Sequence, residues 1–221
     1  MTNVLHGACF DFDGLTVDSE PLHLEATRLA MLEHGISYTH TDVDRYIGKT
    51  VEASVRAIAQ DYGISDVQGL LDARARYFDE IILTRLQVRP GVRELLVRLA
   101  DRKVPCAMVT SGTRSYVGGA LERLELRKFF TAVVAAEDVV RHKPDPEPYL
   151  KAAAAIQVRP EACLALEDSP TGALAAKRAG MYCIAVPSAS TAHADLSHAD
   201  LRLESMELVD AAMVAVLFGA R

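Results

Sequence analysis

The sequence contains no run of about 18 consecutive apolar residues, the length that a membrane-spanning helix requires. It carries a net charge of −6 and no surplus of basic residues of the kind that nucleic-acid-binding faces show. Its first residues lack the basic stretch followed by an apolar run that marks a secretory signal peptide. We therefore expect a cytoplasmic protein without membrane or nucleic-acid partners.

Cysteine is also scarce: there are four, and none has the Cys-x-x-Cys spacing of a zinc or redox site. Each lies in a short apolar run, which predicts buried, reduced, structural thiols at Cys9, Cys106, Cys163 and Cys183. The 221 residues are 50% hydrophobic and 24% charged, which is typical of a folded globular chain. This length allows one large domain, or one domain that carries a smaller insertion.

Short, continuous apolar segments recur along the chain and predict strands of a parallel sheet that is buried on both faces. These segments are 5–12, 104–109, 132–135, 163–166 and 183–186. Segments with helical periodicity occupy 90–99, 113–124, 146–156 and 170–179. The alternation predicts an α/β fold, with a Rossmann-like parallel sheet core flanked by helices.

The alternation is interrupted after Gly14, because no strand-like segment follows until Val104. The helical patterns in this interval are 19–33, 41–46, 51–61 and 67–86. A crossover between neighbouring parallel strands needs only about a dozen residues. We therefore expect residues 17–85 to form an inserted all-helical cap domain, and residues 1–16 and 86–221 to form the catalytic α/β core.

Acidic residues lie at the carboxyl ends of two of the predicted strands. Asp11 and Asp13 end the first, and their spacing in an extended chain places both carboxylates on one side. Two close carboxylates repel each other unless a cation lies beside them, which indicates a hard metal ion such as Mg²⁺. Glu167 and Asp168 form a second acidic pair. The plainer alternatives are a surface turn for the first pair and a helix start for the second.

Phosphate-binding groups follow other strand ends. Thr110 and Ser111 offer a hydroxyl and backbone amides at a turn, which suits a phosphate group. Lys143 lies in a Pro-flanked loop before a helix. A strand-end threonine and a solvated lysine are the alternatives. Because the carboxyl ends of parallel strands meet at one edge, we expect all these groups to form a single site.

Together, these segments resemble the four-part signature of the haloacid dehalogenase superfamily. The subgroup they resemble most is that of the β-phosphoglucomutase-like sugar phosphatases, which carry a helical cap. The segments are Asp11-x-Asp13-Gly14, Thr110, Lys143-Pro144 and Glu167-Asp168-Ser169-x-x-Gly172. The resemblance spans the whole chain, since the expected cap lies directly after the first segment.

The resemblance implies a Mg²⁺-dependent phosphatase that hydrolyses a small phosphorylated metabolite, such as a sugar phosphate, through an aspartyl-phosphate. It makes Asp11 the nucleophile and Asp13 the general acid and base. The phosphate-binding residues would be Thr110, Ser111, Lys143 and Gly14. The metal would be held by Asp11, Asp13 through its backbone carbonyl, Asp168 and, through a water, Glu167. We expect a monomer or a weak homo-oligomer.

His23 and Lys49 are the candidate cap or hinge residues. His23 matches a histidine that mutases of this subgroup carry, although a histidine on an amphipathic helix is more often structural. Where those mutases carry a phosphate-binding arginine this chain has Val51, with Lys49 nearby, which favours hydrolysis over mutase activity. We expect Arg74 and Arg76 to be solvated helix charges rather than substrate contacts.

Four other interpretations compete with a phosphatase. A β-phosphoglucomutase-like phosphomutase shares the motifs, and a non-catalytic phosphometabolite-binding protein is the alternative from another class. The binding protein is disfavoured because no motif residue is missing. A haloacid dehalogenase would need neither Asp13 nor the second acidic pair, and a signalling receiver domain is much shorter and has no cap.

Overall fold

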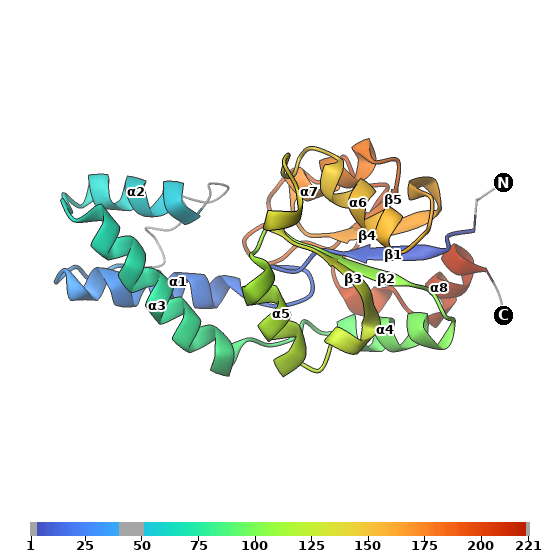
Figure 1. Ribbon diagram of the computed structural model, residues 1–221, viewed down its shortest axis with the longest axis horizontal. Helices are drawn as coiled ribbons and strands as arrows, with labels where there is room; N and C mark the ends of the chain where they lie inside the picture. The colour runs from blue at the N-terminus through green and yellow to red at the C-terminus, as the bar shows by residue number, and fades with distance from the viewer. Residues whose placement is uncertain (1–3, 40–50, 220–221) are drawn as a thin grey trace. The chain divides into compact units, whose positions relative to one another are not determined.

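A computed structural model describes residues 4–39 and 51–219, and the chain forms two compact units (Figure 1). The α/β unit comprises Met1–Asp18 and Gln87–Arg221, and the helical unit comprises Ser19–Leu86. The division therefore lies two residues after the first predicted boundary and one residue after the second. In the part of the chain that the structure describes, no helix has the length and apolar character needed to cross a membrane.

The α/β unit is built on a six-stranded sheet in the order β3-β2-β1-β4-β5-β6. Its strands are β1 (Gly7–Phe10), β2 (Cys106–Val109), β3 (Phe130–Val134), β4 (Cys163–Glu167), β5 (Tyr182–Ala185) and β6 (Leu201–Arg202). Every pairing is parallel. The predicted Rossmann-like α/β fold is confirmed, and β1–β5 overlap the apolar segments that predicted them.

Helices cover both faces of this sheet (Figure 1). On one face lie α6 (Glu147–Ala155) and α7 (Pro170–Arg178), and on the other lie α4 (Val92–Asp101), α5 (Arg114–Arg123) and α8 (Ala211–Phe218). Successive strand side chains alternate between the faces, so Cys9 and Ala107 pack with Tyr149 of α6 and Ala173 of α7. All four cysteines are buried, as predicted.

The described part of the helical unit consists of α1 (Glu20–Glu33), α2 (Val51–Asp61) and α3 (Val67–Arg85). α3 begins after Asp66, whose carboxylate accepts a hydrogen bond from the Gly69 N–H at 2.9 Å and so caps the helix. The unit has a core of its own, which includes Met31 of α1, Ile58 of α2 and Leu70 of α3. The predicted helical segment 41–46 lies outside the described residues.

The chain leaves the α/β unit and returns to it through two adjacent segments. Val17 forms an antiparallel bridge with Val88. The Arg89 guanidinium then donates hydrogen bonds to the carbonyl oxygen of Gly14 and, at 2.9 Å, to that of Pro187. Arg89 thereby ties the loop after β1 to the loop after β5, beside the point of insertion.

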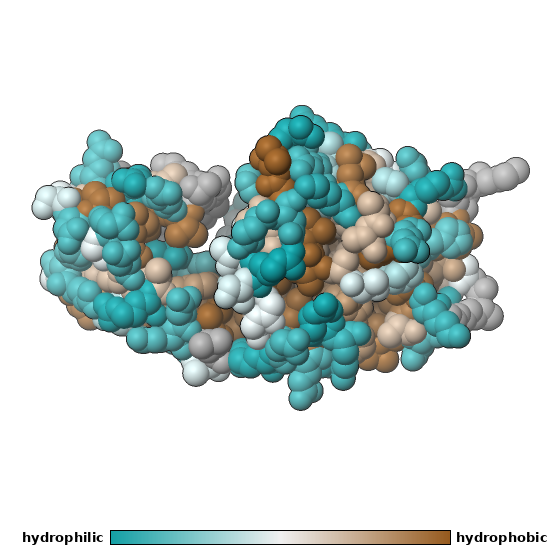
Figure 2. Space-filling view, in the orientation of Figure 1, coloured by the Kyte–Doolittle hydropathy of each residue, from teal (hydrophilic) through white to brown (hydrophobic). Residues whose placement is uncertain are grey.

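Hydrophilic residues cover most of the outer surface in the view of Figure 2, and apolar residues are visible chiefly along the middle of the α/β unit. Among the described residues, the most exposed large apolar side chains are those of Val140 and Val216, at 84% and 73%. They belong to different segments of the chain, the loop before α6 and helix α8. Single exposed apolar residues of this kind are ordinary on protein surfaces.

Candidate active site

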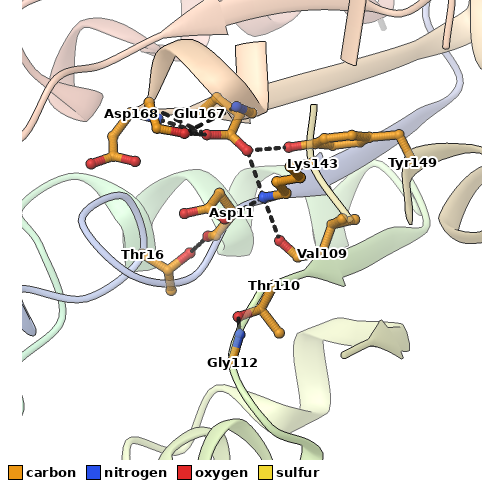
Figure 3. Close-up of polar contacts among 11 residues, drawn as sticks. Asp11, Thr16, Val109, Thr110, Gly112, Lys143, Tyr149, Glu167 and Asp168 are labelled. Atoms are coloured by element: carbon orange, nitrogen blue, oxygen red, sulfur yellow. Dashed lines mark hydrogen bonds and ion pairs between the residues drawn. The ribbon is translucent and has the colours of Figure 1, made fainter. Parts of the chain in front are cut away.

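The predicted site residues of the α/β unit that Figure 3 labels lie together at the carboxyl ends of the central strands. Asp11 directly follows β1, Thr110 follows β2, and Glu167 is the last residue of β4. Because β1 lies between β2 and β4, Asp11 occupies the centre of this edge. Lys143 reaches the same place from the loop before α6.

Lys143 joins the motifs by three hydrogen bonds. Its Nζ lies 2.5 Å from Oδ1 of Asp11 and 2.6 Å from Oε1 of Glu167. It also donates to the carbonyl oxygen of Val109 at 3.1 Å. The lysine side chain is only 6% exposed, so the alternative of a solvated lysine is wrong. A buried lysine in this position holds the ends of three strands together.

Glu167 is fully buried and accepts hydrogen bonds from five donors. Oε1 accepts from Lys143 and from the hydroxyl of Tyr149, which is 2.6 Å away. Oε2 accepts from the N–H groups of Asp168 and Ser169 and from the Ser169 hydroxyl, at 3.0–3.3 Å. The carboxylate also occupies the space above Gly172, where an added Cβ would lie 1.9 Å from Oε1.

The charges of this cluster perturb one another's pKa values. Burial and the negative charge of Glu167 raise the pKa of Asp11 well above its usual value, and the charge of Lys143 opposes this shift. Burial would lower the pKa of Lys143, but the carboxylates of Asp11 and Glu167 raise it overall. Burial and the same two carboxylates raise the pKa of Tyr149, which therefore remains a protonated donor.

Among the described residues, Asp11, Glu167 and Asp168 form a group whose potential metal-ligand atoms all lie within 4.8 Å of one another. Asp168 is buried and lies against the loop after β1. Its Oδ2 is so close to Gly14 that a Cβ added to this glycine would lie only 2.1 Å away. Gly14 also has a φ of +79°, which favours glycine. The close approach therefore brings the first and last motifs together.

The turn after β2 is held by its own threonine. The Thr110 hydroxyl oxygen accepts a hydrogen bond from the Gly112 N–H at 2.9 Å, and the Thr110 N–H donates to Val134 at 2.9 Å. Thr110 is buried, whereas Ser111 is exposed. The turn thus places the buried Thr110 hydroxyl next to the exposed residue Ser111 at the sheet edge.

Asp13 is not a member of the acidic group described above. Its Oδ1 accepts a hydrogen bond from the Tyr116 hydroxyl at 2.7 Å. Tyr116 lies in the first turn of α5, and its ring meets that of Phe12 edge-on with centroids 5.5 Å apart. The two aspartates of the first motif therefore have different surroundings within the α/β unit.

His23 and Arg74 form a separate polar pair inside the helical unit. Arg74 Nη2 donates to His23 Nδ1 at 2.8 Å, so the proton of the neutral imidazole is on Nε2. The imidazole is stacked on Phe78 with centroids 4.2 Å apart. Burial, followed by the charge of Arg74, lowers the pKa of His23 to about 3, and burial lowers that of Arg74 to about 10.

The expectation that both arginines of α3 are solvated is wrong for Arg74, which is 8% exposed. Arg74 is buried because α1 and α3 pack together and its Nε reaches the Thr27 hydroxyl at 3.2 Å. Arg76 is exposed and forms a surface ion pair with Glu33. Lys49 lies outside the described residues.

The sequence motifs did not indicate Tyr149 or Tyr116. Tyr149 lies in an alanine-rich helix that follows Lys143. The only sequence feature that could have indicated its role is that it is a single tyrosine beside a run of alanines. Tyr116 lies 103 positions from Asp13, a separation at which local spacing carries no information. Ser169, by contrast, belongs to the predicted motif. It is the N-cap of α7, and its hydroxyl donates a hydrogen bond to Oε2 of Glu167.

These features define an α/β enzyme with buried carboxylates and a lysine at the carboxyl edge of a parallel sheet. The chain matches the haloacid dehalogenase-like hydrolase family over residues 8–186 and belongs to that family. It is 33% identical over 199 residues to a validoxylamine A 7'-phosphate phosphatase of Streptomyces hygroscopicus subsp. limoneus, covering 90% of this chain and 93% of the relative.

A second relative is a phosphorylated carbohydrates phosphatase of Thermotoga maritima, 32% identical over 182 residues that cover 80% of this chain and 82% of the relative. Among crystal structures, a Thermotoga maritima protein assigned as a β-phosphoglucomutase has a TM-score of 0.84 and 27% identity, covering 96% of this chain and 100% of that chain. The predicted membership of the superfamily and its β-phosphoglucomutase-like subgroup is confirmed.

Proposed function

We propose that this protein is a Mg²⁺-dependent phosphatase that hydrolyses a small phosphomonoester through an aspartyl-phosphate on Asp11. The observation that carries the proposal is the buried Lys143, whose Nζ contacts Asp11 at 2.5 Å and Glu167 at 2.6 Å. A lysine held in this way places positive charge where the phosphoryl group of a substrate would meet Asp11.

The described residues fit a divalent cation. Asp11, Glu167 and Asp168 are buried together, and Lys143 is the cation that contacts the first two. This leaves excess negative charge in a buried site, which a hard cation with oxygen ligands would balance. Asp11, Asp168 and the Asp13 carbonyl would hold it, whereas Glu167, already bound by five donors, orients Lys143. Bound Mg²⁺ would supply positive charge to the phosphoryl oxygens.

The chain's own groups account for both halves of the reaction. Asp11 attacks phosphorus in line, and the ester P–O bond breaks as the aspartyl P–O bond forms. Asp13 donates a proton to the leaving alkoxide and then accepts one from the water that attacks the intermediate. As the bond from water to phosphorus forms, the aspartyl P–O bond breaks, which releases inorganic phosphate and restores the Asp11 carboxylate. Lys143, the Thr110 hydroxyl and the backbone amide of Ser111 bind the phosphoryl oxygens. Gly14, the other predicted phosphate contact, does not share this role, because its N–H donates to the Val17 carbonyl oxygen at 2.9 Å.

The substrate class we propose is a sugar phosphate or a similar small phosphomonoester. The names of the two relatives support this, since one is a phosphatase of validoxylamine A 7'-phosphate and the other a phosphatase of phosphorylated carbohydrates. We assign the helical unit as the cap, which would exclude bulk water and contact the rest of the substrate, with His23 as its candidate hinge residue. Lys49 is the second candidate.

A phosphomutase is the second candidate function, because one crystal structure similar to this chain is assigned as a β-phosphoglucomutase. One residue argues against it. Val51, the first residue of α2 and 45% exposed, stands where mutases of this kind carry an arginine for a second phosphate. Valine offers no hydrogen bond to a phosphate, so we favour hydrolysis.

The test is phosphate release from a panel of sugar phosphates and phosphoglycolate, with and without Mg²⁺. Wild-type protein should release phosphate only with Mg²⁺, and Asp11→Asn should abolish release because an amide is not a nucleophile. The matched control is Asp195→Asn, which changes an exposed aspartate of the same unit and should leave activity intact. Conversion of β-glucose 1-phosphate to glucose 6-phosphate without release would show a mutase, and no turnover of any compound would refute both.

A further inference from the structure

We infer that Tyr116 is a positioning residue for Asp13, and that its hydroxyl holds the Asp13 carboxylate where it can reach the leaving group. The inference rests on the proposed function, because it takes Asp13 as the general acid and base. The observation behind it is the hydrogen bond of 2.7 Å from the Tyr116 hydroxyl to Oδ1 of Asp13. Both residues belong to the α/β unit, so this contact requires nothing from the helical unit.

The Tyr116 ring is packed against two other residues. Phe12, which is fully buried, meets the ring edge-on with an interplanar angle of 79°. The ring also lies so close to Gly112 that a Cβ on this glycine would lie 3.1 Å from Cδ1 of Tyr116. The Tyr116 N–H also donates to the hydroxyl oxygen of Thr113, the N-cap of α5, at 3.3 Å. The hydroxyl is therefore presented from a rigid support.

This support links two parts of the proposed site. Tyr116 packs against Gly112 in the turn that Thr110 holds, and its hydroxyl binds the carboxylate of Asp13. A general acid must lie within hydrogen-bond reach of the oxygen that it protonates. Fixing Asp13 to the phosphate-binding turn keeps that distance constant.

The separation of the Asp13 carboxylate from the other acidic residues also agrees with its role. In an in-line transfer, the leaving oxygen departs on the side of phosphorus opposite to Asp11. The residue that protonates it must therefore stand apart from the group of Asp11, Glu167 and Asp168. Asp13 is not a member of that group, and Tyr116 holds its carboxylate towards α5.

The decisive variant is Tyr116→Phe, which removes the hydroxyl and keeps the ring packing. An alkyl phosphate needs a proton on its leaving oxygen, whereas p-nitrophenyl phosphate has a stable leaving group and needs little help. We expect kcat/KM for a sugar phosphate to fall about 10- to 100-fold and kcat/KM for p-nitrophenyl phosphate to change by less than about threefold. The matched control is Tyr77→Phe, which removes a similar tyrosine–carboxylate hydrogen bond on the surface of the helical unit.

A double-mutant cycle shows whether Tyr116 acts through Asp13. In an Asp13→Ala background, Tyr116→Phe should have no further effect on the sugar phosphate. Equal losses on both substrates, a gain on the sugar phosphate, or an undiminished effect in the Asp13→Ala background would each overturn the inference while leaving the phosphatase intact. If the wild-type protein hydrolyses neither substrate, the proposed function itself is refuted, and the inference with it.

Discussion

Replacing Gly172 by alanine tests the packing around the buried carboxylate of Glu167. Gly172 lies in the first turn of α7, and an added Cβ would be 1.9 Å from Oε1 and 2.0 Å from Cδ of Glu167. Real Cβ atoms do not approach other atoms so closely. Since Glu167 is fully buried and bonded on both oxygens, its carboxylate cannot turn aside without losing partners.

The expected cost has two parts. Forcing a methyl group into a filled space costs about 1–3 kcal/mol. Displacing the carboxylate also weakens its hydrogen bonds to Lys143 and Tyr149, and hydrogen bonds to charged groups contribute about 1.5–3 kcal/mol each. We therefore expect Gly172→Ala to lower the free energy of unfolding by about 3–5 kcal/mol. Activity should fall as well, because Lys143 loses an anchor.

The measurement is urea unfolding followed by circular dichroism, with Gly119→Ala as the matched control. Gly119 is exposed inside α5, and no atom lies within 4 Å of the position its Cβ would take. The same substitution should there raise the free energy of unfolding by about 0.5–1 kcal/mol, because alanine favours the helix. If Gly172→Ala is as stable as wild type, Glu167 does not fill that space and the reasoning is wrong.

Three further predictions concern single side chains of the interior. Tyr149→Phe removes a donor from the Glu167 carboxylate and should lower the free energy of unfolding in urea by about 1–3 kcal/mol; an unchanged value would contradict the contact. His23, with a pKa lowered from 6.5 to about 3, should stay neutral and protonated on Nε2 in ¹⁵N NMR spectra from pH 8 to pH 5. Because the imidazole of the unfolded chain takes up a proton near pH 6.5, His23 should reduce stability as the pH falls below this value, by at most about 1.4 kcal/mol per pH unit. A titration of its ring near neutrality would refute the lowered pKa. Burial raises the pKa of Cys106 to about 12, so a thiol reagent at pH 8 should leave it unmodified in the native protein and modify it after unfolding; rapid native labelling would contradict its burial.

Much of the fold follows from local pattern. The strands β1–β5 are short apolar runs between helices, and parallel strands buried on both faces require such runs. The edge strand β6 has only two residues, Leu201 and Arg202, which is too short for a pattern. Helix α8 is apolar at every position from Ala211 to Phe218, so no helical period distinguishes it.

The candidate site shows the same limit. The motif residues around Asp11 and Glu167 were predictable because strand ends of a parallel sheet must meet at one edge. Tyr116 and Arg74 were not, because their surroundings come from packing between distant segments. Arg74 lies on α3, yet its position is decided by His23 and Thr27 of α1. A helical pattern alone places an arginine in solvent.

The antiparallel bridge between Val17 and Val88 has a consequence for how such a molecule can change. The chain leaves the α/β unit and returns to it at adjacent positions, so the two ends of the insertion are already hydrogen-bonded to each other. A short hairpin could therefore connect these positions in place of the whole helical unit. The inserted segment can then vary widely in length and sequence without destabilising the α/β unit, because the entropic cost of closing a loop grows only slowly with its length. Under the proposed function, the catalytic residues of the α/β unit can then stay unchanged while substitutions in the helical unit alter which substrate is bound.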